Sequence, residues 1–232
     1  MSPHVWWYVA RSGGIVSYVL LAASVIWGLA MTTRVLGKRP KNAWLLDLHR
    51  FLGGAALVFI VIHVVAIMLD SYVHFGLLDV LVPMHGTWHP AAVAWGIVSI
   101  YLLLAVEITS LLRSRLPKRL WRNIHYLSFP VFALASLHAL TAGTDRHSSL
   151  FYYGVIGAIS AVVGLTALRV YQATDDNAAR LEPAPTRAAS STGRRDVAVM
   201  PTEPPVAEPA VALGNLYAAP KVPAPRASRP RR

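Results

Sequence analysis

Four histidines lie inside long apolar stretches: His49 and His63 in one, His125 and His138 in another. An imidazole in hydrocarbon costs free energy, so an ionisable residue in a membrane span indicates a function by default. Imidazoles bind transition metals and haem iron. The sequence has no cysteine, which excludes iron–sulfur ligation and covalently attached c-type haem. The histidines are therefore candidate ligands of haem b iron.

The first two histidines suit two binding sites at two depths. His49 and His63 are 14 residues apart, which in a helix is about 21 Å and brings the two side chains to within roughly 40° of one face. Gly53 lies on that face and, with Gly54 beside it, would let a flat macrocycle approach the backbone. His49 is predicted on the cytoplasmic side and His63 on the outer side.

The second two histidines fit this scheme in depth but not in direction. His125 and His138 are 13 residues apart, about 20 Å of helix, which leaves their side chains roughly 140° apart around an ideal axis. Pro130 lies between them, and a proline inside a helix distorts the axis. We expect a distortion there that redirects one ligand, so that His49 pairs with His125 and His63 with His138. Alternatively, these histidines bond to neighbouring helices or lie at helix ends.

The elements that carry the histidines are predicted to span a membrane. Of the 232 residues, 55% are hydrophobic and 14% charged, too apolar a composition for an ordinary soluble domain. A span needs about 20 apolar residues. The sequence predicts an all-α integral membrane protein of five such helices, at residues 13–33, 48–69, 91–112, 123–142 and 149–168.

Basic residues set the orientation and argue against nucleic-acid binding. They cluster after the first and third spans, which predicts cytoplasmic loops there, an outer N-terminus and a cytoplasmic C-terminus. These residues are Arg34, Lys38, Arg39 and Lys41, then Arg113, Arg115, Lys118, Arg119 and Arg122. Residues 5–171 are expected to form the membrane domain, and residues 172–232, rich in Ala, Pro and Arg, a disordered cytoplasmic tail. We expect no flavin or nicotinamide domain.

Charged residues near the histidines have two interpretations each. Arg50 and Arg122 beside the inner pair, and Arg11 near the outer pair, could bind haem propionates or act as topology and interfacial charges. Glu107, inside the third span, could pair with an arginine or relay a proton. The outer-loop histidines could bind Fe³⁺ or Cu²⁺ or be merely solvated; they are His74, His85, His89 and His147.

The sequence resembles the ferric reductase-like transmembrane domain family. This family includes the membrane cores of NADPH oxidases and ferric reductases, and the haem-binding subunit of a periplasmic methionine sulfoxide reductase. The resemblance covers about residues 5–170. It is carried by the histidine spacings, by Arg11-Ser-Gly-Gly and by LPKRLWRNIHYLSFPVFALASLH over residues 116–138. It implies binding of haem b, transmembrane electron transfer and a place in the bacterial plasma membrane.

We therefore expect the haem-binding electron-transfer subunit of an oxidoreductase, a cytochrome b with two haems. Electrons would come from a separate cytoplasmic flavin reductase or from a membrane quinol, and would pass to a ferric chelate or a periplasmic redox partner. Two alternatives remain open at this stage. One is a quinol-linked cytochrome b anchor of a dehydrogenase, and the other is a metal or proton transporter that uses the histidines without haem.

Overall fold

The computed structural model describes residues 4–33, 35, 43–71, 74–143, 145 and 148–181. The chain divides into two units, Met1–Pro183 and Ala184–Arg232, and all described residues belong to the first. His147 and the expected topology charges Arg34, Lys38, Arg39 and Lys41 lie outside the described residues.

The described residues form seven helices and no strand. Five segments are long and apolar enough to cross a membrane, which confirms the predicted all-α membrane fold. They are α1 (Val5–Thr32), α2 (Ala43–Leu69), α4 (Pro90–Leu111), α5 (Lys118–His125) together with α6 (Ser128–Ala142), and α7 (Ser149–Leu181). The short helix α3 (Leu77–Leu81) lies between α2 and α4 in the chain.

The last helix continues to Leu181, ten residues past the boundary at residue 171 that the sequence predicted. The added segment contains three Ala with Gln, Arg and Leu, which favour helix, and also Thr, two Asp and Asn, which favour it less. A helix can therefore continue beyond the apolar span even though this segment contains too few large apolar residues to bury.

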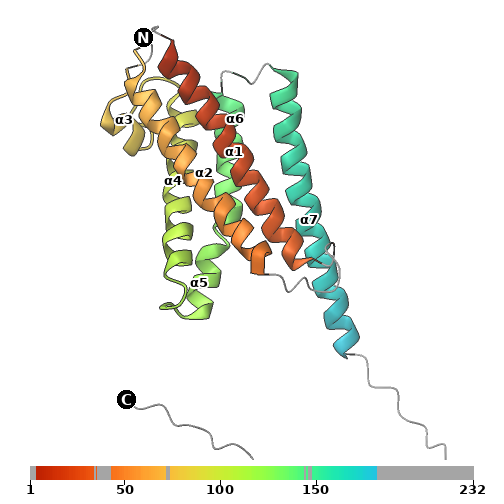
Figure 1. Ribbon diagram of the computed structural model, residues 1–232. Helices are drawn as coiled ribbons and strands as arrows, with labels where there is room; N and C mark the ends of the chain where they lie inside the picture. The colour runs from red at the N-terminus through yellow and green to blue at the C-terminus, as the bar shows by residue number, and fades with distance from the viewer. Residues whose placement is uncertain are drawn as a thin grey trace, which may run out of the picture. The chain divides into compact units, whose positions relative to one another are not determined.

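The membrane helices associate as two closely packed pairs, α1 with α2 and α4 with α6, while α7 lies against α1 (Figure 1). The pairs meet in a small apolar core made of Leu21, Ala56, Leu103 and Val131, one residue from each helix. A second core joins α1, α6 and α7, and within it the Tyr18 hydroxyl and the Ser136 hydroxyl are 3.0 Å apart. Small residues such as Ala56 let the helices approach closely, as is usual in membranes.

The fourth span is broken just before Pro130. Tyr126 and Leu127 separate α5 from α6, and the Leu127 N–H donates to the carbonyl of Ile124 in a three-residue step. Proline has no N–H to offer the carbonyl of Tyr126 four residues back. That carbonyl accepts from Phe129 instead, at 3.2 Å. The distortion predicted around Pro130 is therefore present, and it separates His125, the last residue of α5, from His138 in α6.

Candidate functional site

The four histidines meet in the two predicted pairs. The ring centroids of His49 and His125 are 6.1 Å apart, with ring planes at 74°. Those of His63 and His138 are 6.4 Å apart, at 77°. If two imidazoles bind one metal ion from opposite sides through bonds of about 2 Å, their ring centres are separated by about 6.4 Å. Both pairs have the separation of two ligands that face a single ion.

Three of the four rings are oriented by a backbone carbonyl of a neighbouring helix. The Nδ1–H of His63 donates to the carbonyl of Ala10 at 2.6 Å, and that of His138 to the carbonyl of Ala92 at 2.8 Å. The Nδ1–H of His49 donates to the carbonyl of Ser24 at 3.0 Å. A histidine that donates from Nδ1 keeps the Nε2 lone pair for a metal. These bonds therefore select the tautomer that a ligand needs.

A glycine lies against each of the same three rings. A Cβ on Gly14 would come 2.9 Å from Nδ1 of His63, and one on Gly96 would come 2.9 Å from Nδ1 of His138. A Cβ on Gly28 would come 3.1 Å from Cε1 of His49. At Gly14 and Gly96 a larger residue would force the imidazole to shift, because real Cβ atoms essentially never come closer than 3.0 Å to another heavy atom. At Gly28 the His49 ring would have to give by a few tenths of an ångström.

Carbonyl and glycine form one repeated arrangement, in which the glycine follows the accepting residue by four positions. It occurs at Ala10 and Gly14, at Ser24 and Gly28, and at Ala92 and Gly96. The two instances on α1 are 14 residues apart, which matches the spacing of His49 and His63 on α2. The tetrapeptide Gly-Ile-Val-Ser occurs at residues 14–17 and again at 96–99. That repeat is a sequence signal that could have located these positions.

His125 lacks this arrangement. Its Nδ1 is buried and has no hydrogen-bond partner among the described residues, and the same is true of Nε1 of Trp121. The His125 ring instead stacks on Trp121, with centroids 5.2 Å apart and planes at 23°. Fourteen residues after Gly96, the chain has Ser110 in place of a glycine. The two pairs are therefore supported differently.

A cavity of about 300 Å³ contains the outer pair. Its lining is largely apolar and includes His63, His138, Gly14 and Gly96. Arg11 and Asp145 also line it, and two guanidinium nitrogens of Arg11 donate to the two carboxylate oxygens of Asp145. The pair connects α1 to the segment between α6 and α7. Arg11, which the sequence offered as a propionate ligand, thus lies at the cavity with a carboxylate partner.

The other predicted site residues lie around the inner pair. Arg50 is exposed, and its guanidinium is 3.8 Å from the Asp47 carboxylate. Arg122 is exposed on α5. Gly53 is buried, and a Cβ there would come 2.6 Å from Oε1 of Glu107. The close approach at Gly53 therefore involves the Glu107 carboxyl group.

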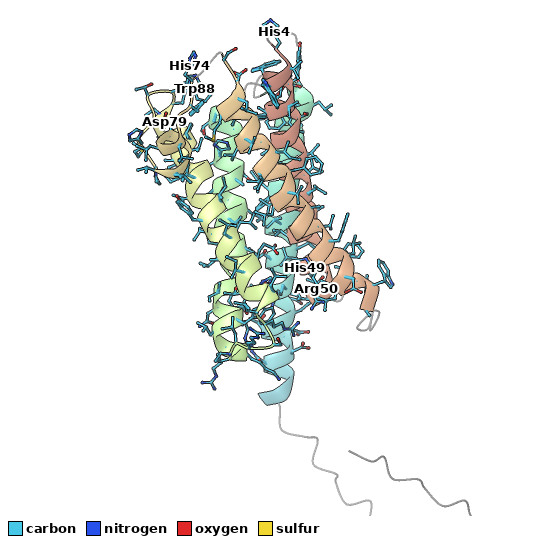
Figure 2. The ribbon with its side chains drawn as sticks, turned by 60° about the vertical axis from the view of Figure 1, so that its left-hand side comes forward. His4, His49, Arg50, His74, Asp79 and Trp88 are labelled. Atoms are coloured by element: carbon cyan, nitrogen blue, oxygen red, sulfur yellow. The ribbon has the colours of Figure 1, made fainter. Side chains whose placement is uncertain are left out.

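Among the outer-loop histidines that the structure describes, His74, His85 and His89, no cluster forms that could hold a metal ion. His85 donates from Nδ1 to Asp79 at 2.7 Å, and this bond, followed by one from the Gly76 N–H, lowers the pKa of Asp79. His74 is exposed. His89 has a left-handed backbone (φ 40°) before α4, and its ring meets the edge of Trp88. Figure 2 shows His74, Asp79 and Trp88 near one end of the bundle, with His49 and Arg50 toward the other.

Comparison with known proteins identifies the family. Residues 13–136 match the ferric reductase like transmembrane component, which covers more than half of the chain. The chain belongs to this family. Transmembrane electron transfer is the general role of ferric reductase-like domains, which commonly bind haem. No curated protein and no solved structure matches the chain.

The donor set fits haem better than a bare metal ion. Within the part of the chain that the structure describes, no group of three or more His, Cys, Asp or Glu side chains converges. Two imidazoles alone leave a zinc-type ion short of ligands, whereas haem iron has two axial positions for the protein to fill. Three of the rings use Nδ1 for a backbone carbonyl, which leaves the Nε2 lone pair of each for iron.

Proposed function

We propose that this ferric reductase-like protein carries electrons across a bilayer through two b haems. His49 and His125 would hold the inner haem, and His63 and His138 the outer one. The observation that carries the proposal is the separation of the ring centroids within each pair, 6.1 Å and 6.4 Å, at two levels of one bundle. Bound haem supplies a one-electron couple at each level.

The chain's own residues would hold the ligands and exclude water. The carbonyls of Ser24, Ala10 and Ala92 fix three imidazoles in the ligating tautomer. The largely apolar lining of the outer cavity would limit water around His63 and His138. With two histidines available to each haem iron, each site would be suited to electron transfer and not to binding of a small substrate at the metal.

We infer the direction of transfer from the charges. The exposed cations between α4 and α5 mark the end near His49 and His125 as cytoplasmic under the positive-inside rule. The donor would be a cytoplasmic flavin reductase or a membrane quinol. The acceptor would be a ferric chelate or a periplasmic redox partner. The chain itself would lie in the plasma membrane of a bacterium.

The test is a reduced-minus-oxidised spectrum of the purified full-length chain with pyridine-haem quantification. We expect two b haems per chain. His63→Ala and His138→Ala should each remove the outer haem, and the double variant should remove no more. His49→Ala and His125→Ala should behave in the same way for the inner haem. The exposed His74→Ala is the control and should keep both haems. A chain without a b-type α-band, or with one haem that His138→Ala leaves unchanged, would contradict the proposal.

A further inference from the structure

One carboxyl group inside a membrane span has no partner among the described residues. Glu107 lies within α4, four residues before the helix ends at Leu111. Among the described residues, no cation lies within ion-pair distance of it and no hydrogen bond reaches it. The sequence offered an arginine partner for Glu107, and none is present in this part of the chain. An ionisable residue in a span is costly to keep, so its retention calls for a function.

The carboxyl group of Glu107 faces the helix that carries two of the ligands. Its Oε1 lies so near Gly53 of α2 that a Cβ there would come within 2.6 Å. The hydroxyl of Ser24 flanks the same point, 3.8 Å from that Cβ position. Ser24 in turn contacts His49, because its hydroxyl lies 3.3 Å from Nδ1 and its carbonyl accepts from Nδ1. Ser24 thus lies between the carboxyl group and an inner ligand.

The position along α2 places Glu107 nearer to the inner pair. Gly53 is four residues from His49 and ten residues from His63, which correspond to about 6 Å and about 15 Å along the helix. A charge on Glu107 therefore acts mainly on the inner site, because electrostatic interactions weaken with distance.

We propose that Glu107 is the proton-binding group coupled to reduction of the inner site. When one electron from the flavoprotein or quinol donor enters the His49/His125 site, one proton from the cytoplasmic side binds the Glu107 carboxylate. When the electron leaves toward the outer site, the O–H bond breaks and the proton is released. The inner site gains one electron while Glu107 gains one proton, and both are lost again when the electron moves on. This inference rests on the proposed function.

Charge balance in a medium of low dielectric constant explains the coupling. With haem bound, ferric iron in its doubly negative porphyrin ring and between two neutral imidazoles would carry one positive charge at the metal centre, which the carboxylate would balance. Adding an electron cancels that positive charge, and an unbalanced carboxylate within the span is then costly. Protonation removes the cost.

Among the residues that the structure describes, no other carboxyl group lies beside Glu107. On the elements around it, α1 presents the uncharged Ser24, and α2 presents Gly53 and, one turn away, His49. Glu107 is the only charged residue of α4. Arg50 at the same end is exposed and lies near Asp47. The described cations that follow α4 are also exposed, with Arg113 over the Trp121 ring; they are Arg113, Arg115, Lys118, Arg119 and Arg122. The helix α5, which packs against α4, also carries His125, the second residue of the inner pair.

The experiment is a potentiometric titration of the haem-loaded full-length chain in lipid nanodiscs between pH 6 and 8. The His63→Ala variant keeps only the inner pair intact, so its titration shows which reduction step belongs to the inner haem. We expect the equilibrium constant for inner reduction to fall about tenfold per pH unit, which is about 59 mV for one electron. Glu107→Gln should remove this dependence. The exposed carboxylate Asp175 offers the matched control, and Asp175→Asn should retain it.

Infrared difference spectroscopy gives a second readout. Reduction of the wild-type chain should produce the C=O band of a protonated carboxylic acid, and Glu107→Gln should lack that band. If Glu107→Gln does not assemble, Glu107→Asp is the variant to test. Its carboxyl group is one methylene shorter, so reduction of the inner haem should still depend on pH.

Two results would overturn the inference: an inner step in the wild-type chain that is independent of pH, or a dependence that persists in Glu107→Gln. Absence of haem from the wild-type chain would instead contradict the proposed function, so the two failures can be told apart.

Discussion

His63 lies against Gly14 so closely that a methyl group on that glycine would come 2.9 Å from Nδ1 of the imidazole. The carbonyl of Ala10, one turn earlier on the same helix, accepts the Nδ1–H bond of that imidazole. One turn of α1 therefore does two things for a candidate ligand: it provides space for the ring, and it fixes the nitrogen that carries the proton. The same relationship joins His49 to Gly28 and Ser24, and His138 to Gly96 and Ala92.

We predict that Gly14→Ala removes the outer haem and leaves the inner one. The new methyl group would displace the His63 ring. The backbone of His63 already lies close to α1, 3.4 Å from a Cβ position on Gly13, so the residue has little room to move away. Pyridine-haem quantification should give one haem per chain. Gly157→Ala on α7 is the matched control, because a Cβ there meets nothing within 4 Å. Alanine favours a helix over glycine by about 0.5–1 kcal/mol, so this control should be at least as stable as the wild type. Two haems in Gly14→Ala would show that the close approach is not needed.

We predict that the inner haem depends on the Trp121 ring. His125 has no hydrogen-bond acceptor at Nδ1 among the described residues and stacks on Trp121 instead. Stacked aromatic pairs contribute about 0.5–1.5 kcal/mol, so Trp121→Ala should speed loss of the inner haem about two- to tenfold, and Trp121→Phe much less. Transfer of haem to apomyoglobin measures this rate. The exposed Trp44 supplies the control variant, Trp44→Ala. Equal loss rates in the alanine and phenylalanine variants would argue against stacking.

Much of this arrangement could be predicted from the sequence. The length and polarity of a segment show whether it spans the membrane, and the helical repeat shows the depth and direction of each side chain. The depth of each histidine follows from counting residues along a span, so the pairing of His49 with His125 could be expected. Pro130 signalled a break because a missing N–H has a local effect. The break lies at Tyr126 and Leu127, before the proline, where the carbonyl that Pro130 cannot satisfy is located.

The supporting residues could not be predicted, because they act between helices. Gly53 and Gly14 look alike in the sequence, yet Gly14 lies against His63 and Gly53 lies against Glu107. Which helix lies next to which glycine depends on the packing of α1 with α2 and of α4 with α6. Arg11 shows the same limit: its partner Asp145 is 134 residues away, and no local pattern links them.

We predict that Arg11 and Asp145 act as a unit that holds α1 to the segment between α6 and α7. The pair makes two charge-assisted hydrogen bonds, and the Asp145 side chain is only 10% exposed. Because breaking one partner leaves the other charge unbalanced, Arg11→Gln and Asp145→Asn should each destabilise the protein, by about 1 kcal/mol or more. The double variant should cost no more than one single variant. Thermal denaturation followed at the haem Soret band, arranged as a double-mutant cycle, measures this coupling. Additive losses would mean that the two residues act separately.

We predict that the outer segment around α3 loosens in acid. The pKa of Asp79 is lowered, first by the hydrogen bond from His85 and then by the Gly76 N–H. A carboxylate whose pKa falls on folding stabilises the fold fully above its unfolded value, about 3.9, and this contribution is lost as the pH falls through the lower folded value. Hydrogen exchange of residues 76–88, corrected for the intrinsic rate, should therefore be slow at pH 6 and faster near pH 3. Asp79→Asn should raise the exchange at pH 6 toward the acid value, whereas Asp175→Asn should not. If Asp79→Asn exchanged like the wild type at pH 6, the carboxylate would have no part in holding α3.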